Sequence, residues 1–463
     1  MPAVLERARI VAPPGWSRWL VPPAALAIHL AIGQAYAWSV FKAAISSDTA
    51  MGLSGTVTAL PFQLAIVMLG LSAAVLGTKV EEHGPRWAMT MSLIFFSSGL
   101  LISALGMSLG WFWLVIVGYG LVGGIGLGIG YISPVSTLIK WFPDRPGMAT
   151  GIAIMGFGGG ALVASPLTTK LLSAYGGNTD SSIATTFLTL GLGYAVFMAL
   201  GVVLIRVPAD DWTPAGWTPP QTPAGEHTAR VSAASAVKTP QFWLLWVVLC
   251  FNVTAGIGIL ERAAGIYTDF FPDPTSPESV VTAAAGFVAF LSLTNMLGRF
   301  VWSSVSDLVG RKNIYRLYLG VGALLYLYIS LFTNTNKVLF LVSAMVILSF
   351  YGAGFATAPA YLRDLFGTYQ VGAIHGRLLT AWSVAGVLGP LIVNAIADMG
   401  DEGSTGRYVP AFVVMIVLLV VGFVANELIK PVDPKYSEPD PAAQDPGSAA
   451  TDGESADTKE AKV

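Results

Sequence analysis

Twelve long apolar runs constrain the fold of this 463-residue chain more than any other feature. An α-helix needs about 20 predominantly apolar residues to cross a bilayer, and the runs are long enough to do so. The strands of a membrane β-barrel are much shorter, at roughly ten residues, and they alternate in polarity. The sequence therefore predicts an all-α integral membrane protein with twelve transmembrane helices. The predicted spans cover roughly residues 19–41, 57–78, 87–108, 111–138, 148–172, 183–206, 241–263, 280–304, 314–332, 337–360, 372–397 and 408–429.

The composition argues against a large soluble core and against enzymatic chemistry. Charged residues make up 11% of the chain, compared with about 25% in ordinary soluble domains. Cys250 is the only cysteine and lies within an apolar span, which excludes an intrachain disulfide and a thiolate metal cluster. The four histidines are far apart, and there is no H-E-x-x-H, G-x-S-x-G or Walker segment. We therefore expect no enzymatic activity, no cofactor and no nucleic-acid partner.

Positive charges gather on one side of the predicted membrane. Of the 25 Lys and Arg residues, 19 lie in the N-terminal segment, the even-numbered loops and the segment after the last span, whereas four lie in the opposite loops. Because cytoplasmic loops carry the excess of Lys and Arg, we predict a multi-pass protein of the cytoplasmic membrane with both termini in the cytoplasm. A cleaved signal peptide is the alternative for the first run, which ends in the small-x-small pattern Ala35-Tyr36-Ala37. We favour a retained helix because the run contains His29 and Gln34 and makes the number of spans even.

A repeated turn divides the chain into two halves. Glu81 and Gly84 follow the second span, and Asp307 and Gly310 follow the eighth span, each 226 residues later. An acid near a helix end with a base just beyond it predicts a two-position latch, and the repeat predicts two six-helix halves. The stretch between the halves is too polar to span the membrane and too rich in Pro to form one helix. We therefore predict an N-terminal segment 1–18, a first half 19–207, a linker 208–238, a second half 239–430 and a disordered acidic tail 431–463.

The first of these turns carries a known family pattern. Gly77, Glu81, Gly84 and Arg86 match G-x-x-x-D-R-x-G-x-R in residue type or charge, although Glu82 replaces its first arginine. The turn resembles the signature loop of the major facilitator superfamily. This resemblance implies two halves that rock about a central site. It also implies gating roles for Gly77, Glu81, Gly84, Arg86, Asp307, Gly310 and Arg311.

Other short sequence segments resemble one particular family of anion carriers. They are similar to sequences of the oxalate:formate antiporter family and are spread over both halves. In dicarboxylate carriers of that family, a lysine of span eleven aligns with Trp382 of this chain. Because this second cation is missing, the charge count favours a monocarboxylate such as formate, lactate or pyruvate over oxalate. The segments are GQAYAWSVF from Gly33, GYISP from Gly130, KWFPD from Lys140, APAYLRDLFG from Ala358 and GAIHGRLLT from Gly372.

Arg299 is the strongest candidate for a binding residue, because it places a guanidinium within an almost purely apolar span. A charge at the bilayer centre costs about 2.5–3.5 kcal/mol on insertion scales, so it is rarely retained without a partner or a cavity. On a helix, Asn295, Trp302 and Ser303 would share one polar and aromatic stripe with Arg299, which would suit a small anion. The alternatives are that Arg299 extends to the membrane surface or pairs with a buried carboxylate or carbonyl group.

Further polar and aromatic side chains are predicted to line the same cavity. Polar groups in hydrocarbon must be satisfied, so those of span one are expected to face the interior of the bundle. An interfacial aromatic belt is the alternative for Tyr36 and Trp38. The predicted substrate-binding residues are Gln34, Tyr36, Tyr119, Tyr131, Asn295, Arg299, Trp302 and Trp382, of which the aromatic members rest on the resemblance.

Two residues could couple transport to protons. Glu261 is the best-placed carboxylate within a span, although its position beside Arg262 is equally compatible with an ion pair at the outer rim. His29 could relay a proton, with a packed structural histidine as the alternative. Proton symport and anion exchange both stay open at this point.

The predicted function is secondary active transport of small monocarboxylates by a functional monomer in the lipid bilayer. The coupled species would be a proton or a counter-anion. An oxalate/formate exchanger is one alternative. An efflux carrier for apolar drugs is another, in which Arg299 would be structural and carboxylates would not compete with the drug. A transporter-like sensor would bind an anion without turnover.

Overall fold

The computed structural model describes residues 5–48, 51–53, 55–209, 212–218, 229–332, 336–401 and 404–438. Twelve segments in this part of the chain are long and apolar enough to cross a membrane, which confirms the predicted number of spans. The helices are α1 (Val21–Ile32), α2 (Trp38–Asp48), α3 (Gly55–His83), α4 (Pro85–Leu109), α5 (Phe112–Val115), α6 (Gly124–Trp141), α7 (Pro146–Ala174), α8 (Asp180–Leu204), α9 (Ala233–Ala236), α10 (Pro240–Phe270), α11 (Pro277–Val309), α12 (Arg311–Leu331), α13 (Lys337–Phe366), α14 (Val371–Leu378), α15 (Thr380–Ala397) and α16 (Val409–Leu428).

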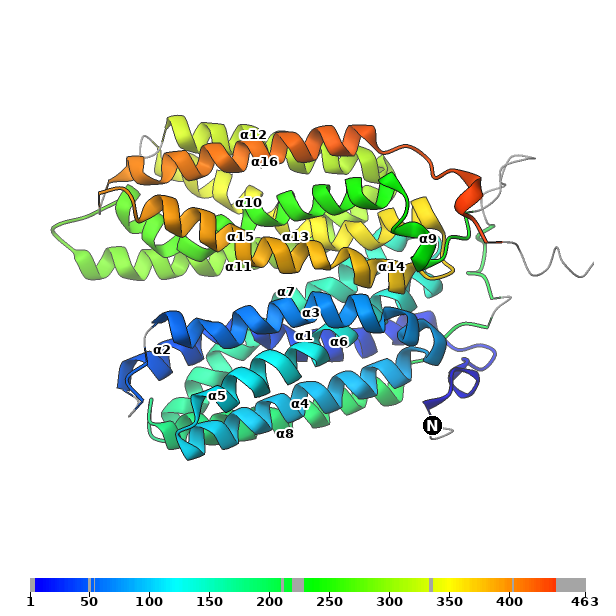
Figure 1. The fold of residues 1–463 in the computed structure, drawn as a ribbon, viewed down its shortest axis with the longest axis horizontal. Helices are drawn as coiled ribbons and strands as arrows, with labels where there is room; N and C mark the ends of the chain where they lie inside the picture. The colour runs from blue at the N-terminus through cyan, green and yellow to red at the C-terminus, as the bar shows by residue number, and fades with distance from the viewer. Residues whose placement is uncertain are drawn as a thin grey trace, which may run out of the picture.

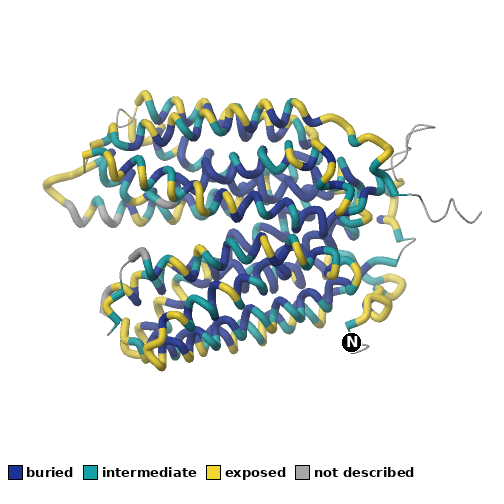
Figure 2. Tube along the Cα trace, in the orientation of Figure 1, coloured by how far each residue is buried: buried dark blue, intermediate teal, exposed yellow. Residues whose placement is uncertain are grey.

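The helices form two bundles, one from α1 to α8 and the other from α10 to α16 (Figure 1). The halves meet through α7 with α11 and through α3 with α14 and α15. They lie close together at the end that holds the N-terminal segment and α9, and their ribbons diverge toward the opposite end (Figure 1). Buried residues fill the inside of each half and the contact between the halves, whereas exposed residues lie on the outer faces (Figure 2). Large apolar side chains such as Val75, Val196 and Leu391 are exposed, as expected for a protein surrounded by lipid.

The first membrane span is not one continuous α-helix, contrary to the prediction for residues 19–41. A 3₁₀ segment, Gly33–Ala37, separates α1 from α2. Its first residue packs against α7 so closely that a Cβ on Gly33 would lie 2.4 Å from the carbonyl oxygen of Phe157. A Cβ on Gly160 would likewise lie 2.5 Å from the backbone of Gly33. The break therefore lies where two glycines let α1 and α7 touch backbone to backbone.

Two other spans are interrupted, and a third is longer than predicted. The fourth contains a π-helical segment, Ile116–Gly123, which includes Tyr119. Such segments are rare and are often found at functional sites. The eleventh is divided at Leu379 into α14 and α15, and the seventh continues beyond the predicted end to Phe270.

The repeated turn has the same construction in both halves. Gly84 and Gly310 lie between consecutive helices with φ of 86° and 87°, a conformation that glycine adopts without strain. Arg86 donates hydrogen bonds to carbonyl groups at the end of α8, and Lys312 donates to those at the end of α16. A cation at a helix C-terminus also offsets the helix dipole. Arg86 therefore ties α4 to the end of α8 within its own half.

The segments near both ends of the chain make contacts that the sequence did not indicate. Val11 and Val207 form a β-bridge, as do Val231 and Ser437. Residues 431–438, assigned to the disordered tail from the sequence, thus include a contact with the linker. The rest of the tail and linker residues 210–211 and 219–228 lie outside the described residues.

A methyl group at Gly160 should destabilise the protein, because it would collide with the backbone of Gly33. We expect Gly160→Ala to cost about 1–3 kcal/mol through overpacking. The measurement is the thermal stability of the purified protein in detergent. Gly193→Ala is the matched control, because nothing lies within 4 Å of its added Cβ. Equal melting temperatures for the two variants would contradict the packing described.

Candidate functional site

Arg299 lies in α11 at the contact between the two halves and is fully buried, with 0% exposure. Two glycines, one from each half, make room for its side chain. A Cβ on Gly158 of α7 would lie 2.8 Å from Nε of Arg299, and a Cβ on Gly352 of α13 would lie 3.0 Å from its Cγ. The sequence thus provides a slot for one long cationic side chain.

The guanidinium of Arg299 is only partly satisfied. Nη1 donates to the carbonyl oxygen of Ile154 at 3.3 Å, and Nε donates to Oδ1 of Asn295 at 3.4 Å. Nη2 is buried and has no hydrogen-bond partner. Among the described residues no carboxylate pairs with it; its other neighbours are the rings of Phe157 and Phe355, whose centroids lie 5.9 and 5.4 Å from Cζ. An unpaired buried cation is costly, so an anion beside Nη2 would stabilise this arrangement.

The rings of Phe157 and Phe355 beside this guanidinium belong to a larger aromatic cluster. The ring of Trp382 lies 5.5 Å from that of Tyr131, 5.4 Å from that of Phe157 and 4.5 Å from that of Phe355. Tyr36 joins the cluster through Phe157, at 5.1 Å. The Trp382 Nε1 and the Tyr131 hydroxyl are both buried without a partner. We call Arg299 and these five aromatic residues the cage; it holds three unpaired hydrogen-bond donors.

The cage contains four of the eight predicted binding residues, Tyr36, Tyr131, Arg299 and Trp382, and a fifth, Asn295, bonds to its guanidinium. Phe157 and Phe355 were not predicted from the sequence. An aromatic residue in an apolar span gives the same sequence pattern whether its side chain faces lipid or a binding site. A signal was present in the glycines at 156 and 158–160 around Phe157, since a glycine-rich helix face leaves space for a neighbouring side chain.

Three predicted binding residues lie elsewhere. Tyr119 donates to Oε1 of Gln34 at 3.3 Å, and its ring packs on that of Trp38 at 4.4 Å, inside the first half. Trp38 is itself buried, so it does not form an interfacial belt. Trp302 donates to Ser349 Oγ at 3.0 Å within the second half. The predicted stripe on α11 is therefore divided, with Asn295 at the cage and Trp302 turned away from it.

The structure describes the side chain of one of the two predicted proton-coupling residues. His29 is buried beside the cage, with Nε2 3.1 Å from the carbonyl oxygen of Tyr131. Glu261 lies in α10, but its side chain is outside the described part of the structure. Its neighbour Arg262 bonds to Asn394 and Asp398 of α15.

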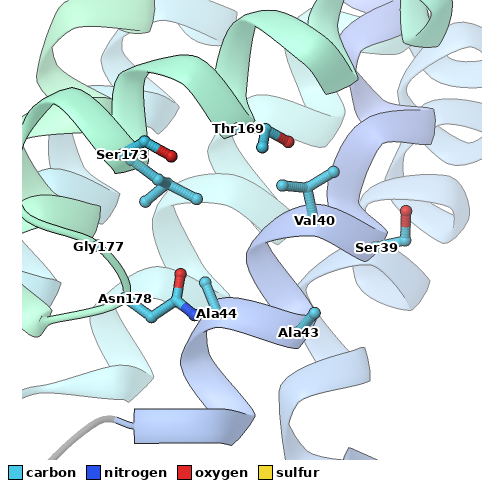
Figure 3. A pocket seen from close by; sticks show the side chains of 9 residues that line it. Ser39, Val40, Ala43, Ala44, Thr169, Ser173, Gly177 and Asn178 are labelled. Carbon is cyan, nitrogen blue, oxygen red and sulfur yellow. The ribbon is translucent and has the colours of Figure 1, made fainter.

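A hollow of about 540 Å³ lies apart from the cage, between α2 and the far end of α7. Figure 3 shows Ser39, Val40 and Ala43 on one side of it and Thr169 and Ser173 on the other. None of its lining residues is charged, and none belongs to the predicted binding set. Its uncharged lining offers no counter-charge for an anion, whereas the cage does.

Two acids hold the halves together at the end that carries the termini. Glu81 of α3 accepts a hydrogen bond from the Gly372 N–H at the start of α14, at 2.9 Å. Asp307 of α11 accepts from the N–H groups of Gly147 and Met148 at the start of α7, both at 2.8 Å. The first N–H groups of a helix lack partners within the helix and carry partial positive charge, so they suit a carboxylate. We call this pair of contacts the latch.

Each latch acid has a cation beside it. Arg311 pairs with Asp307. Lys140 of α6 pairs with Glu81 at 2.7 Å, so this lysine supplies the positive charge that the family pattern places at residue 82. Gly77 lets α3 approach α14, since a Cβ there would lie 2.9 Å from Cα of Ala373.

The N-terminal segment is fixed to the same end by an ion pair. Arg18 donates to both carboxylate oxygens of Asp144, at 2.6 and 3.0 Å, and its Cζ lies 4.5 Å from the ring centroid of Phe142. Burial acts to raise the pKa of Asp144, but the hydrogen bonds and charge of Arg18 outweigh it, and the pKa falls below its ordinary value. The pair thus stabilises the folded state above the ordinary pKa of an aspartate and less as the pH falls through the lowered value.

Comparisons with known proteins agree with this architecture. The model of the Major Facilitator Superfamily matches residues 24–272 and 274–458. The chain is 25% identical to the oxalate:formate antiporter of Oxalobacter formigenes, over 90% of this chain and 93% of the antiporter. It is also 25% identical to apicoplast pyruvate carrier 1 of Toxoplasma gondii, over 73% of this chain and 69% of the carrier.

Among solved structures, the transporter FucP in the outward conformation has the same fold. It aligns with a TM-score of 0.63 and 15% identity, over 90% of this chain and all of FucP. The predicted fold and the predicted absence of an enzyme class are therefore confirmed. The chain belongs to the major facilitator superfamily and is a multi-pass membrane transporter of small molecules, not an enzyme.

Proposed function

We propose that this transporter carries small monocarboxylates, such as formate, lactate or pyruvate, bound at the cage. The observation that supports this most strongly is the buried Arg299, whose Nη2 has no partner and whose charge no described carboxylate offsets. The unpaired Nε1 of Trp382 and hydroxyl of Tyr131 add two donors to the same cluster. One carboxylate group could accept hydrogen bonds from these donors and neutralise the guanidinium.

The number of charges favours a monoanion. Among the described residues, no second cation contacts the cage. The position in span eleven that aligns with the lysine of dicarboxylate carriers is occupied by Trp382 in this chain. Relatives named as an oxalate:formate antiporter and a pyruvate carrier are consistent with carboxylates as the substrate class. The aromatic walls would pack against the short apolar part of lactate or pyruvate. Coupling is either to a counter-anion or to a proton.

Transport would follow from rocking of the two halves about the cage. Arg299 lies in the second half and bonds to Ile154 of the first, so movement of the halves would change the binding site itself. We place the end with the termini in the cytoplasm, because it carries the excess of Lys and Arg. The latch would then close the inner side, and the protein would act as a monomer in the cytoplasmic membrane.

The first test is uptake of labelled formate, lactate and oxalate into proteoliposomes with Arg299→Lys beside the unchanged protein. Lysine retains the charge but loses the planar fork that binds a carboxylate through two N–H groups. We expect uptake of the monocarboxylate to fall about tenfold or more, in line with loss of a charged hydrogen bond, while the amount of folded protein stays normal. Arg316→Lys, at an exposed ion pair with Glu427, is the matched control.

Unchanged uptake in Arg299→Lys would show that the guanidinium does not bind the substrate. An apolar drug that is transported and that carboxylates fail to displace would instead favour the efflux alternative.

Substrate charge can be tested with Trp382→Lys. A second cation in the cage should let oxalate compete with lactate about tenfold more strongly than it does in the unchanged protein, since a charged hydrogen bond contributes about 1.5–3 kcal/mol. Trp382→Met is the control, because it opens similar space without adding charge. Inhibition constants for oxalate measure the effect. If oxalate competes equally more strongly in Trp382→Lys and Trp382→Met, space and not charge determines the preference for a monocarboxylate.

The latch can be tested with Asp307→Asn. The amide has one acceptor oxygen in place of two carboxylate oxygens, and it carries no charge to attract Arg311 and the start of α7. We expect the inner side to open more often and a cysteine at buried Ser136, beside Gly372, to react with a membrane-impermeant maleimide about tenfold faster. Replacing Cys250, the only cysteine, gives a clean background.

Asp433→Asn, which removes an exposed acid outside the latch, serves as the control for that experiment. A labelling rate that is the same in both variants would exclude Asp307 as a gate residue.

A further inference from the structure

Two buried histidines from opposite halves contact the same tyrosine. His29 lies in α1 and His375 in α14, with exposures of 0% and 2%. Their ring centroids lie 5.4 and 5.9 Å from that of Tyr131. The Nδ1 atom of each histidine is buried without a hydrogen-bond partner. A buried nitrogen without a hydrogen-bond partner costs free energy of folding. Binding of a ligand or a proton would explain why it is retained.

The hydrogen bond of His29 defines which of its nitrogens is free to bind a proton. Its Nε2 faces the carbonyl oxygen of Tyr131 at 3.1 Å. A carbonyl oxygen only accepts, so Nε2 carries the hydrogen and donates it. In the neutral ring Nδ1 is then a bare lone pair. His29 Nδ1 is therefore a buried base that points to no donor of the protein.

The two histidines lie between the latch and the cage. His375 follows Gly372, whose N–H donates to Glu81 of the latch, by less than one helical turn. Trp382 of the cage follows two turns later along the same span. The Tyr131 ring touches both histidines and also Trp382, at 5.5 Å, so it forms the shared wall of the pair and the cage.

The helices packed against the pair offer it little compensating charge. No described carboxylate contacts either ring. The charge of Arg299 of α11 acts on His29. Glu81 of α3 is bound by Gly372 and Lys140, Asp364 of α13 is bound by Arg311, and Arg377 of α14 donates to its own helix. The other ionisable side chains on these helices are Lys79, Glu82 and His83 of α3, Tyr131 and Lys140 of α6, Lys170 of α7, Asp180 and Tyr194 of α8, Asp307 of α11, and Lys337, Tyr351, Tyr361 and Arg363 of α13, among the residues whose side chains the structure describes.

We propose that His29 and His375 form a proton-binding site whose occupancy is coupled to the carboxylate in the cage, so that one proton and one monocarboxylate bind together. This inference rests on the proposed function. The proton comes from water on the open side, forms an N–H bond at His29 Nδ1 and returns to water when that bond breaks on the other side. His375 is the second acceptor of the same site.

Electrostatics would couple proton binding to carboxylate binding. A proton on His29 places a second positive charge near Arg299, and two like charges in a region of low dielectric repel strongly. A carboxylate bound to Arg299 removes that repulsion. The two histidines also repel each other's charge, so the pair holds one proton and not two. Because coupling between two ligands is reciprocal, a proton on the pair strengthens carboxylate binding by the same factor, typically about 5–150-fold.

The experiment measures protons taken up when the purified protein binds lactate in a weakly buffered detergent solution with a pH-sensitive dye. In the unchanged protein we expect the medium to become more alkaline by one proton for each lactate bound, and lactate affinity to fall as the pH rises. In His29→Gln, lactate should still bind while proton uptake falls, because only His375 is left to accept the proton. In His375→Gln, uptake should shift to lower pH, because one acceptor is lost.

His83→Gln is the matched control, since the ring of His83 bonds to the Lys79 carbonyl of its own helix and stacks on Trp87, away from the pair. Lactate binding without proton uptake in the unchanged protein would overturn the proton site but leave the carboxylate site standing. Proton uptake that is the same in His29→Gln or His375→Gln as in the control would also overturn it. Loss of lactate binding in Arg299→Lys but not in the histidine variants separates the two sites, and absence of carboxylate binding in the unchanged protein would overturn both.

Discussion

The buried guanidinium of Arg299 is the constraint on which the rest of the site depends. It lies where membrane-spanning helices exclude water, at a cost that only partners or a bound anion can offset. Glycines on α7 and α13 provide its slot, and aromatic rings from both halves provide its walls. Because one of its hydrogen bonds crosses to Ile154 of the other half, the charge belongs to the contact between the halves and not to either half alone.

The latch shows how one short sequence repeat closes one side of the protein. Glu81 and Asp307, 226 residues apart, each bind the first turn of a helix in the opposite half. These bonds are polar, few and located at helix ends, so they can be exchanged for water when the halves separate. The apolar contacts inside each half, by contrast, cannot be replaced by hydrogen bonds to water. The structure thus concentrates its reversible contacts at the end that carries the termini and the charge of Arg299 between the halves.

Much of the architecture could be predicted from the sequence, because spans, a repeated turn and a charge in an apolar run are local features. Arg299 was evident for that reason. The direction of Trp302 was not, since it depends on Ser349 in another helix. The pairing of Lys140 with Glu81 and the break at Gly33 depend in the same way on contacts between distant segments. His375 carries no local signal, and its relation to His29 follows only from the meeting of the two halves at Tyr131.

The most direct test of the central claim is an experimental structure of the protein with lactate bound. The account predicts one carboxylate group in the cage, with its oxygens about 2.7–3.2 Å from Nη2 of Arg299 and Nε1 of Trp382. Lactate bound elsewhere, for instance in the hollow between α2 and α7, with Arg299 still unpaired or bonded to a carboxylate of the protein, would contradict the account.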